Sequence, residues 1–157
     1  MVYVFDTNSF RVLGNYYPKQ FRTFWGKFDQ YVAEHKVISV REVYRELEGM
    51  LPDDYHLTSW VKTHRDIFLP PSGDETECVR KILSVKHFQQ LIKKRNILQG
   101  MPVADPWIIA AASIEGRCVV TEEKEKPTAA KIPNVCNHFN IPCTNLEGFM
   151  ENENWVF

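Results

Sequence analysis

The chain has 157 residues, a length typical of one domain, and we expect a single domain over residues 1–157. It is 44% hydrophobic and 25% charged, with 19 lysines and arginines against 20 aspartates and glutamates, which excludes a disordered or polybasic chain. The longest apolar run, Trp107 to Ala112, is far shorter than the roughly 20 residues of a membrane span. The N-terminus lacks the basic region of a signal peptide, and the four cysteines form no CxxC pair. We therefore expect reduced thiols, a cytoplasmic location, and neither a membrane segment nor a zinc ribbon.

The first half of the chain alternates short apolar runs with helical patterns. Residues 2–5 are β-branched and aromatic, which predicts a buried strand that ends at Asp6. A helix is predicted to open at Pro18, because the aromatic and apolar residues that follow recur with a helical period. A second strand is predicted at residues 36–39 and a helix at residues 41–48, closed by a glycine. Asp53 or Asp54 is expected to cap the next helix.

The second half continues the same alternation after a proline-rich break. A helical stretch is predicted from Asp74 to Gly100, and a strongly apolar helix opens at Asp105 and runs to about Glu115. Four shorter elements follow, namely a strand at 118–121, a helix from 133, an edge strand at 141–144 and a turn or helix at 146–151. Short apolar strands that alternate with helices predict a three-layer α/β/α sandwich with a short-stranded, mostly parallel central sheet.

Four carboxylates are placed to converge at one edge of this sheet. Asp6 and Glu123 follow predicted strands, and ligands of open α/β sheets bind beyond the carboxyl ends of the strands. Glu46 lies on the helix after the second strand, and Asp105 begins the helix before the 118–121 strand. Carboxylates gathered in one place repel each other unless a cation separates them. Oxygen ligands without thiolate or imidazole favour Mg²⁺ or Mn²⁺ over zinc.

The sequences around these four acids resemble, in order, the four motifs of PIN domains. They are VFDTN at residues 4–8, VYREL at 43–47, ADPWIIAAA at 104–112 and VVTEE at 119–123. The resemblance implies a PIN-like fold and metal-dependent RNA cleavage, as in VapC-like toxins of toxin–antitoxin pairs. It implies that the acidic catalytic and metal-binding residues are Asp6, Glu46, Asp105 and Glu123, and that the supporting polar residues are Thr7, Asn8 and Thr121. It also implies Mg²⁺ or Mn²⁺ as the cofactor.

The activity implied by the resemblance is metal-assisted phosphodiester hydrolysis of RNA, with one of the carboxylates available to accept a proton from water. An RNA backbone requires positive charge nearby, and six bases lie in a stretch without acids from Cys78 to Ala104. These candidate RNA-binding residues are Arg80, Lys81, Lys86, Lys93, Lys94 and Arg95. Single-stranded or loop RNA suits such a site better than a duplex. An antitoxin protein and a second copy of the chain are the partners that the resemblance implies.

Each site residue also has a purely structural interpretation. Asp6 is placed to cap the turn after the first strand, Asp105 is at a position where an aspartate caps a helix, and Glu123 lies in a charged run typical of a solvated turn. Glu42 shares a helix face with Glu46 but falls in the first turn, where an exposed carboxylate is favoured by the helix dipole. The basic stretch has the composition of a solvated face. Aromatic residues of the Pro18 helix are expected in the core rather than in a base-stacking surface.

Two other classes of protein that share this strand-and-acid arrangement do not fit the sequence. A haloacid-dehalogenase-like phosphatase needs a second aspartate two residues after the first, where Asn8 stands. A receiver domain needs paired acids near the N-terminus, which are absent from the sequence. The remaining alternative is a catalytically inactive PIN-like module that binds RNA or protein, because Glu123 stands where the PIN pattern has aspartate.

Overall fold

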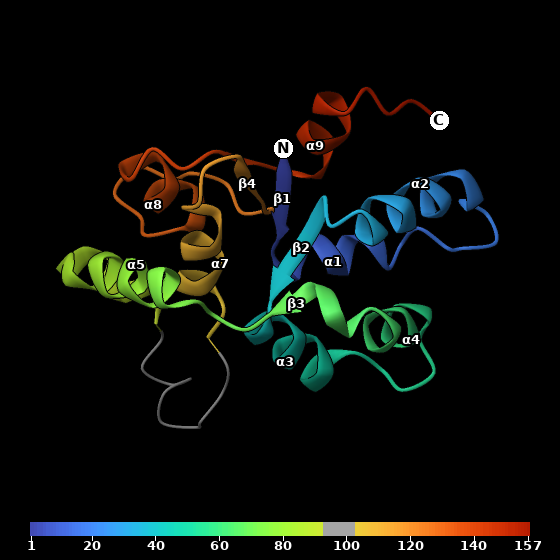
Figure 1. Ribbon diagram of the computed structural model, residues 1–157, viewed down its shortest axis with the longest axis horizontal. Coiled ribbons are helices and arrows are strands. Elements are labelled where there is room, and N and C mark those ends of the chain that lie inside the picture. Colours follow the sequence, from blue (N-terminus) through green and yellow to red (C-terminus); the bar gives the residue numbers. More distant parts are fainter. Residues whose placement is uncertain (93–102) are drawn as a thin grey trace.

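The computed structural model describes residues 1–92 and 103–157, and these residues build a five-stranded sheet (Figure 1). The strands lie in the order β3-β2-β1-β4-β5, and every neighbouring pair is parallel. In chain order they are β1 (Val2–Phe5), β2 (Val37–Val40), β3 (Phe68–Leu69), β4 (Arg117–Val120) and β5 (Cys143–Thr144). The predicted α/β class is confirmed, and the strand order is a PIN-like topology.

Helices cover both faces of this sheet. Figure 1 shows α5, α7 and α8 on one side of the strands and α1, α2 and α4 on the other, which gives the three layers predicted. The described helices are α1 (Thr7–Leu13), α2 (Arg22–Ala33), α3 (Arg41–Met50), α4 (His56–Thr63), α5 (Gly73–Ser84), α7 (Asp105–Ala112), α8 (Ile132–His138) and α9 (Leu146–Asn152), with short 3₁₀ helices η1 (Arg65–Ile67) and η2 (Lys86–Leu91).

Aromatic side chains fill the layer between the sheet and α2. The Phe5 ring lies 5.5 Å from the rings of Phe10 and Phe28 and 5.3 Å from the ring of Phe149, measured between centroids. These residues come from β1, α1, α2 and α9, so the cluster ties together segments far apart in the sequence. Edge-to-face contacts of this kind add to the free energy gained by burying the rings. The aromatic residues of α2 are therefore core residues, as predicted.

Several predicted boundaries are wrong. The helix expected at Pro18 begins at Arg22, because Gln20 and Phe21 donate backbone hydrogen bonds to Tyr17 in a turn and Phe21 has non-helical angles. The helical stretch expected from Asp74 to Gly100 ends at Ser84, where the next residue has extended backbone angles, and a 3₁₀ helix follows. Residues 93–102 lie outside the described part.

The free thiols expected from the sequence are present. All four cysteines are unpaired, and Cys118 and Cys136 are buried in the core. Among the described helices, none is long and apolar enough to cross a membrane.

Candidate active site

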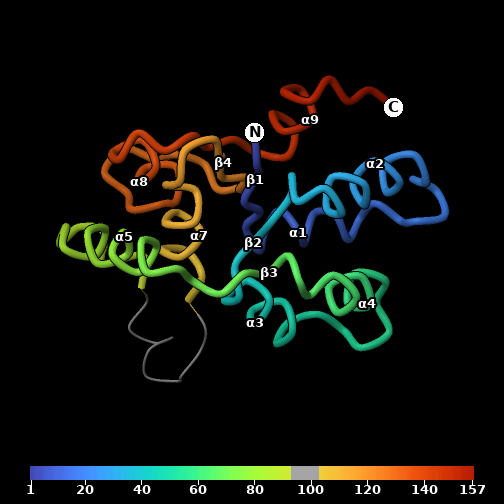
Figure 2. Tube along the Cα trace, viewed as in Figure 1, coloured from blue at the N-terminus to red at the C-terminus, as the bar shows by residue number. Residues whose placement is uncertain are grey.

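The candidate site forms where β1 and β4 end side by side. These strands are paired in register from Val2 opposite Arg117 to Phe5 opposite Val120, and the backbone N–H of Asp6 continues the ladder by donating to Val120 at 2.9 Å. The trace in Figure 2 shows the N-terminal strand beside a strand from the last third of the chain. Asp6 and Thr121 follow these strands directly, so the strand ends bring them together.

A cavity of about 320 Å³, here called the acidic cavity, opens at this edge. Its lining includes all four carboxylates predicted from the sequence, although they come from separate segments of the chain. The lining residues are Asp6, Thr7, Asn8, Arg11, Glu46, Leu91, Val103, Ala104, Asp105 and Glu123. The structure therefore gathers the predicted acidic residues, whereas their catalytic role stays a prediction.

Asp6 is held by hydrogen bonds to both of its carboxylate oxygens. Its Oδ1 accepts from the backbone N–H of Thr7 and its Oδ2 from the hydroxyl of Thr121, each at 2.7 Å. The first bond caps α1, so the structural interpretation of Asp6 is also correct. Only 3% of Asp6 is exposed, and this burial raises its pKa to about 7 despite the two bonds, with Glu123 and Glu46 adding to the shift.

Glu46 connects three of the elements around the acidic cavity. Its Oε2 accepts from the Thr7 hydroxyl at 2.5 Å, and its Oε1 accepts from the backbone N–H of Ala104 at 3.2 Å. Burial raises the pKa of Glu46, and the two hydrogen bonds oppose the shift. Val43 and Leu47, which are fully buried, anchor α3 as predicted. Because Thr7 contacts both Asp6 and Glu46, it fixes the two carboxylates relative to each other.

Asp105 is the first residue of α7 rather than its cap. The cap position is Ala104, and no side chain caps the helix there. The interpretation of Asp105 as an N-cap is therefore wrong, and its carboxylate is one of the groups that line the acidic cavity. The backbone of Ala104 in turn is fixed by Glu46.

Glu122 and Glu123 each bind the start of a helix instead of forming a solvated turn. The Oε2 of Glu123 accepts from the backbone N–H of Ile132 at 2.9 Å, and the Oε1 of Glu122 accepts from that of Leu146 at 2.8 Å. Both glutamates are half-buried. Asn8 fixes the turn that carries them, since its side-chain oxygen accepts from the backbone N–H of Glu122 at 2.9 Å. Glu123 thus has a structural function besides any role toward a metal.

The oxygen donors of the acidic cavity suit a hard divalent cation, but they do not form a complete cage. Within residues 1–92 and 103–157, no three histidine, cysteine, aspartate or glutamate side chains are close enough together to hold a metal ion. Mg²⁺ characteristically binds through one or two carboxylates, several waters and substrate phosphates, whereas Ca²⁺ and structural Zn²⁺ need more protein ligands. Buried Asp6 is the donor that most requires a counter-charge. The residues present therefore fit a partly hydrated Mg²⁺ or Mn²⁺.

Two features were not predicted from the sequence: Arg11 lines the acidic cavity, and Glu42 is buried. Arg11 lines the acidic cavity because it lies one helical turn after Thr7 on the same face of α1, a spacing visible in the sequence. Glu42, expected to be exposed, is only 6% exposed, and its Oε1 accepts from the Arg41 guanidinium at 3.1 Å. Its Oε2 has no hydrogen-bond partner among the described residues.

The predicted basic stretch is only partly described. Arg80, Lys81 and Lys86 do not line the acidic cavity, and the exposed Arg80 side chain pairs with Glu77 at 2.6 Å. Lys93, Lys94 and Arg95 lie outside the described residues. Leu91 and Val103, which come before and after that segment in the sequence, both line the acidic cavity. RNA contact by the basic stretch stays a prediction.

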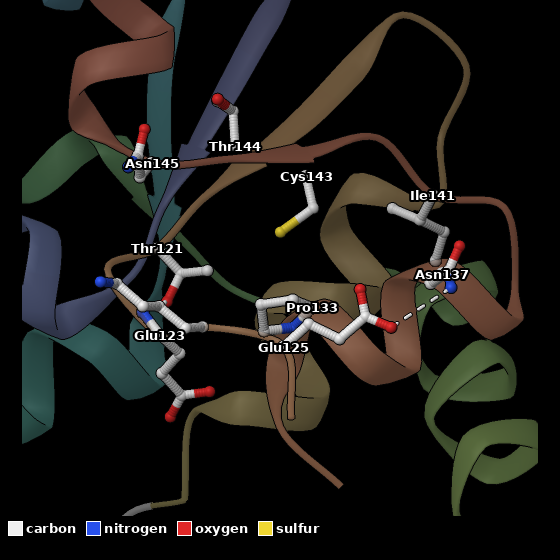
Figure 3. Close-up of a pocket in the computed structure, with 10 residues that line it drawn as sticks. Thr121, Glu123, Glu125, Pro133, Asn137, Ile141, Cys143, Thr144 and Asn145 are labelled. Carbon is white, nitrogen blue, oxygen red and sulfur yellow. Dashed lines mark hydrogen bonds between the residues drawn. The ribbon is translucent and has the colours of Figure 1, made fainter. Parts of the chain in front are cut away.

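A second cavity, of about 400 Å³, adjoins the acidic cavity and shares Glu123 with it. Figure 3 shows the Sγ of Cys143 pointing into this space beside Pro133. A hydrogen bond with the buried Cys136 thiol lowers the pKa of Cys143. Glu125 and Asn137 are within 3.5 Å of each other at the far side (Figure 3).

The fold and the site define a parallel α/β protein of PIN-like topology with carboxylates gathered at the carboxyl edge of its sheet. A family model described as Domain of unknown function (DUF4411) matches residues 3–157, so the chain belongs to this family. Comparisons with curated proteins and with solved structures found no match.

Proposed function

We propose that this protein is a Mg²⁺- or Mn²⁺-dependent endoribonuclease of the VapC-like type, the toxin of a toxin–antitoxin pair. The observation that carries the proposal is the acidic cavity, in which Asp6, Glu46, Asp105 and Glu123 meet at the carboxyl edge of a PIN-like sheet. Acids that line one cavity, one of them a buried and hydrogen-bonded aspartate, repel each other in the absence of a cation. The order of the four PIN-like motifs along the sequence supports the same proposal.

The proposed roles follow from the contacts of each residue. Asp6 and at most one other carboxylate of the acidic cavity would hold a partly hydrated Mg²⁺ or Mn²⁺, which would supply Lewis-acid activation of water and neutralise charge on the phosphate. Thr7 and Thr121 hold the Asp6 carboxylate in one orientation, so it is preorganised. Arg11 is the basic residue among the described residues that line the acidic cavity, and its planar guanidinium suits a phosphate oxygen pair.

The substrate and partners proposed rest on the PIN resemblance together with the shape of the site. An open edge cavity admits a single strand or loop of RNA more readily than a regular duplex, whose grooves are recognised by shape. An antitoxin protein, a homodimer and a cytoplasmic location belong to the same proposal.

Metal binding is tested by thermal unfolding in the presence of Mn²⁺ or Mg²⁺ without RNA. A metal at ten times its dissociation constant stabilises the native state by roughly 1.4 kcal/mol, which raises the melting temperature by about 3–5 °C. Asp6→Asn should lose most of this shift, because it removes a central oxygen ligand. Asp54→Asn removes an exposed carboxylate outside the acidic cavity and should keep the full shift. Equal metal shifts in the two variants would contradict the proposed site.

The alternative function is a PIN-like module that has lost catalysis and binds RNA or protein. The hydrogen bond from the backbone N–H of Ile132 to Glu123 favours this alternative, because that carboxylate already has a structural role. A metal-induced rise in melting temperature without any RNA cleavage would favour this alternative over the nuclease.

A further inference from the structure

A cluster of three arginines lies on the side of α3 next to β3. Arg41 and Arg45 of α3 and Arg65 of η1 line a separate cavity of about 160 Å³ together with Tyr44, Glu48 and Phe68. The three arginines, here called the arginine cluster, are exposed, whereas Tyr44 and Phe68 form a buried floor. The chain as a whole has a net charge of −1, so this concentration of cations is a local feature.

The contacts of the arginine cluster leave much of its positive charge unpaired. The Arg65 guanidinium lies 4.8 Å from the centre of the Tyr44 ring, a stacking contact that orients it without neutralising it. Arg41 pairs with Glu42 at 3.1 Å, while Arg45 has no ion pair with any residue that the structure describes. Among the described residues, Glu48 is the one acid in the lining. Three guanidiniums against one lining carboxylate favour an anionic ligand.

The chemistry of the cluster favours a phosphate. Arginine presents a planar set of N–H donors that binds two phosphate oxygens at once, and several arginines around one small cavity suit a tetrahedral anion. The buried tyrosine ring leaves no open aromatic face for a base to stack on. The recognised group is therefore the backbone of a nucleic acid rather than its bases.

The position of the cluster relates it to the acidic cavity. Arg45 and Glu46 are consecutive residues of α3, so their side chains point about 100° apart around the helix. Glu46 lines the acidic cavity, whereas Arg45 lines the cavity of the cluster. The two sites thus lie on different sides of one helix, whose diameter is about 10–12 Å. A strand of a few nucleotides is long enough to reach both.

We propose that the arginine cluster binds a backbone phosphate of the single-stranded RNA whose reacting phosphate lies in the acidic cavity. This inference rests on the proposed nuclease function and adds the path of the substrate across α3. It assigns RNA positioning to Arg41, Arg45 and Arg65, which the sequence pattern did not single out.

The test measures binding of a short single-stranded oligoribonucleotide by fluorescence anisotropy in EDTA, so that binding is read without cleavage. The double variant Arg45→Gln/Arg65→Gln should bind roughly tenfold more weakly, the size of one lost charge-assisted hydrogen bond. The slope of log affinity against log salt concentration should fall by roughly 0.7, the value for one phosphate contact to a single strand. Lys19→Gln/Arg22→Gln is the matched control, because both of its side chains are exposed and outside both cavities.

The outcomes separate this inference from the proposed function. A loss of RNA affinity in the arginine variant but not in the control variant supports phosphate binding by the arginine cluster, whether or not the wild-type protein cleaves RNA when metal is added. Equal affinity and equal salt slope for the arginine and control variants would overturn it, even if wild-type cleavage is metal-dependent. Displacement of the RNA by poly-glutamate as readily as by unlabelled RNA would also overturn it, since the cluster would then be a site for an acidic protein. Inorganic phosphate should compete only weakly, because it presents one phosphate where the oligoribonucleotide presents several along its strand.

Discussion

Glu46→Gln is expected to lower metal-dependent RNA cleavage by more than about 100-fold, beyond the loss typical of outer-shell partners of a metal. The substitution removes a carboxylate from the acidic cavity, where we expect it to act toward the metal. The fold should survive, because a glutamine can still accept from the Ala104 N–H and donate to the Thr7 hydroxyl. Cleavage rates measured together with melting curves would separate a loss of catalytic activity from a loss of folded protein.

Glu42→Gln is the matched control, one turn earlier on the same helix. Glu42 is buried but does not line the acidic cavity, and its pairing partner Arg41 is 44% exposed. Arg41 stays solvated when the pair is lost, and one oxygen of Glu42 already lacks a hydrogen-bond partner among the described residues, so the free energy of unfolding should change by less than about 1 kcal/mol. Cleavage should be retained. If Glu42→Gln were inactive and Glu46→Gln active, the assignment of the second motif would be wrong by one turn.

Asp6→Asn should make the metal-free protein more stable above neutral pH. Burial raises the pKa of Asp6 from 3.8 to about 7, so between these values the native state binds a proton that the unfolded state has lost. The contribution of Asp6 to stability therefore falls as the pH rises from about 4 to 7 and is lowest above 7. The cost of the buried charge there is roughly 4 kcal/mol. A poorer hydrogen bond from asparagine offsets about 1 kcal/mol of the gain, leaving roughly 3 kcal/mol.

Urea unfolding in EDTA at several pH values measures this effect. The difference in unfolding free energy between Asp6→Asn and wild type should be largest at pH 8 and should shrink toward pH 4. The exposed variant Asp54→Asn should show no comparable trend. A wild-type protein that is more stable than Asp6→Asn at pH 8 without metal would mean that the Asp6 charge is already compensated.

Much of the fold was predictable because local sequence and tertiary structure agree. The run at residues 2–5 is apolar on both faces and forms β1, whose side chains are in contact with helices on both sides of the sheet. Asp6 and Glu123 could be placed at one edge because parallel strands end there together. Glu46 and Asp105 do not follow a strand directly, but each lies on a helix next to a predicted strand in the chain, and the resemblance to PIN motifs supported both.

The features that sequence analysis missed depend on contacts between distant segments. Burial of Glu42 cannot be inferred from its first-turn position, which favours an exposed carboxylate. The helix-start contacts of Glu122 and Glu123 join residues separated by 24 and 9 positions. Arg65 joins the cluster on α3 only because η1 and β3 lie beside that helix. The composition of the sequence indicated Arg80 and its basic neighbours as RNA-binding residues instead.

Hydrolysis of RNA with a divalent metal is the activity that we propose for the acidic cavity. The most direct measurement is the cleavage of a fluorescent single-stranded RNA by wild-type protein, Glu46→Gln and Glu42→Gln, titrated with Mn²⁺ and then treated with EDTA. We expect internal cleavage that rises with Mn²⁺, stops in EDTA, is lost in Glu46→Gln and is kept in Glu42→Gln. Cleavage that is insensitive to EDTA or equal in wild type and Glu46→Gln would contradict it, as would intact RNA at a Mn²⁺ concentration that raises the melting temperature.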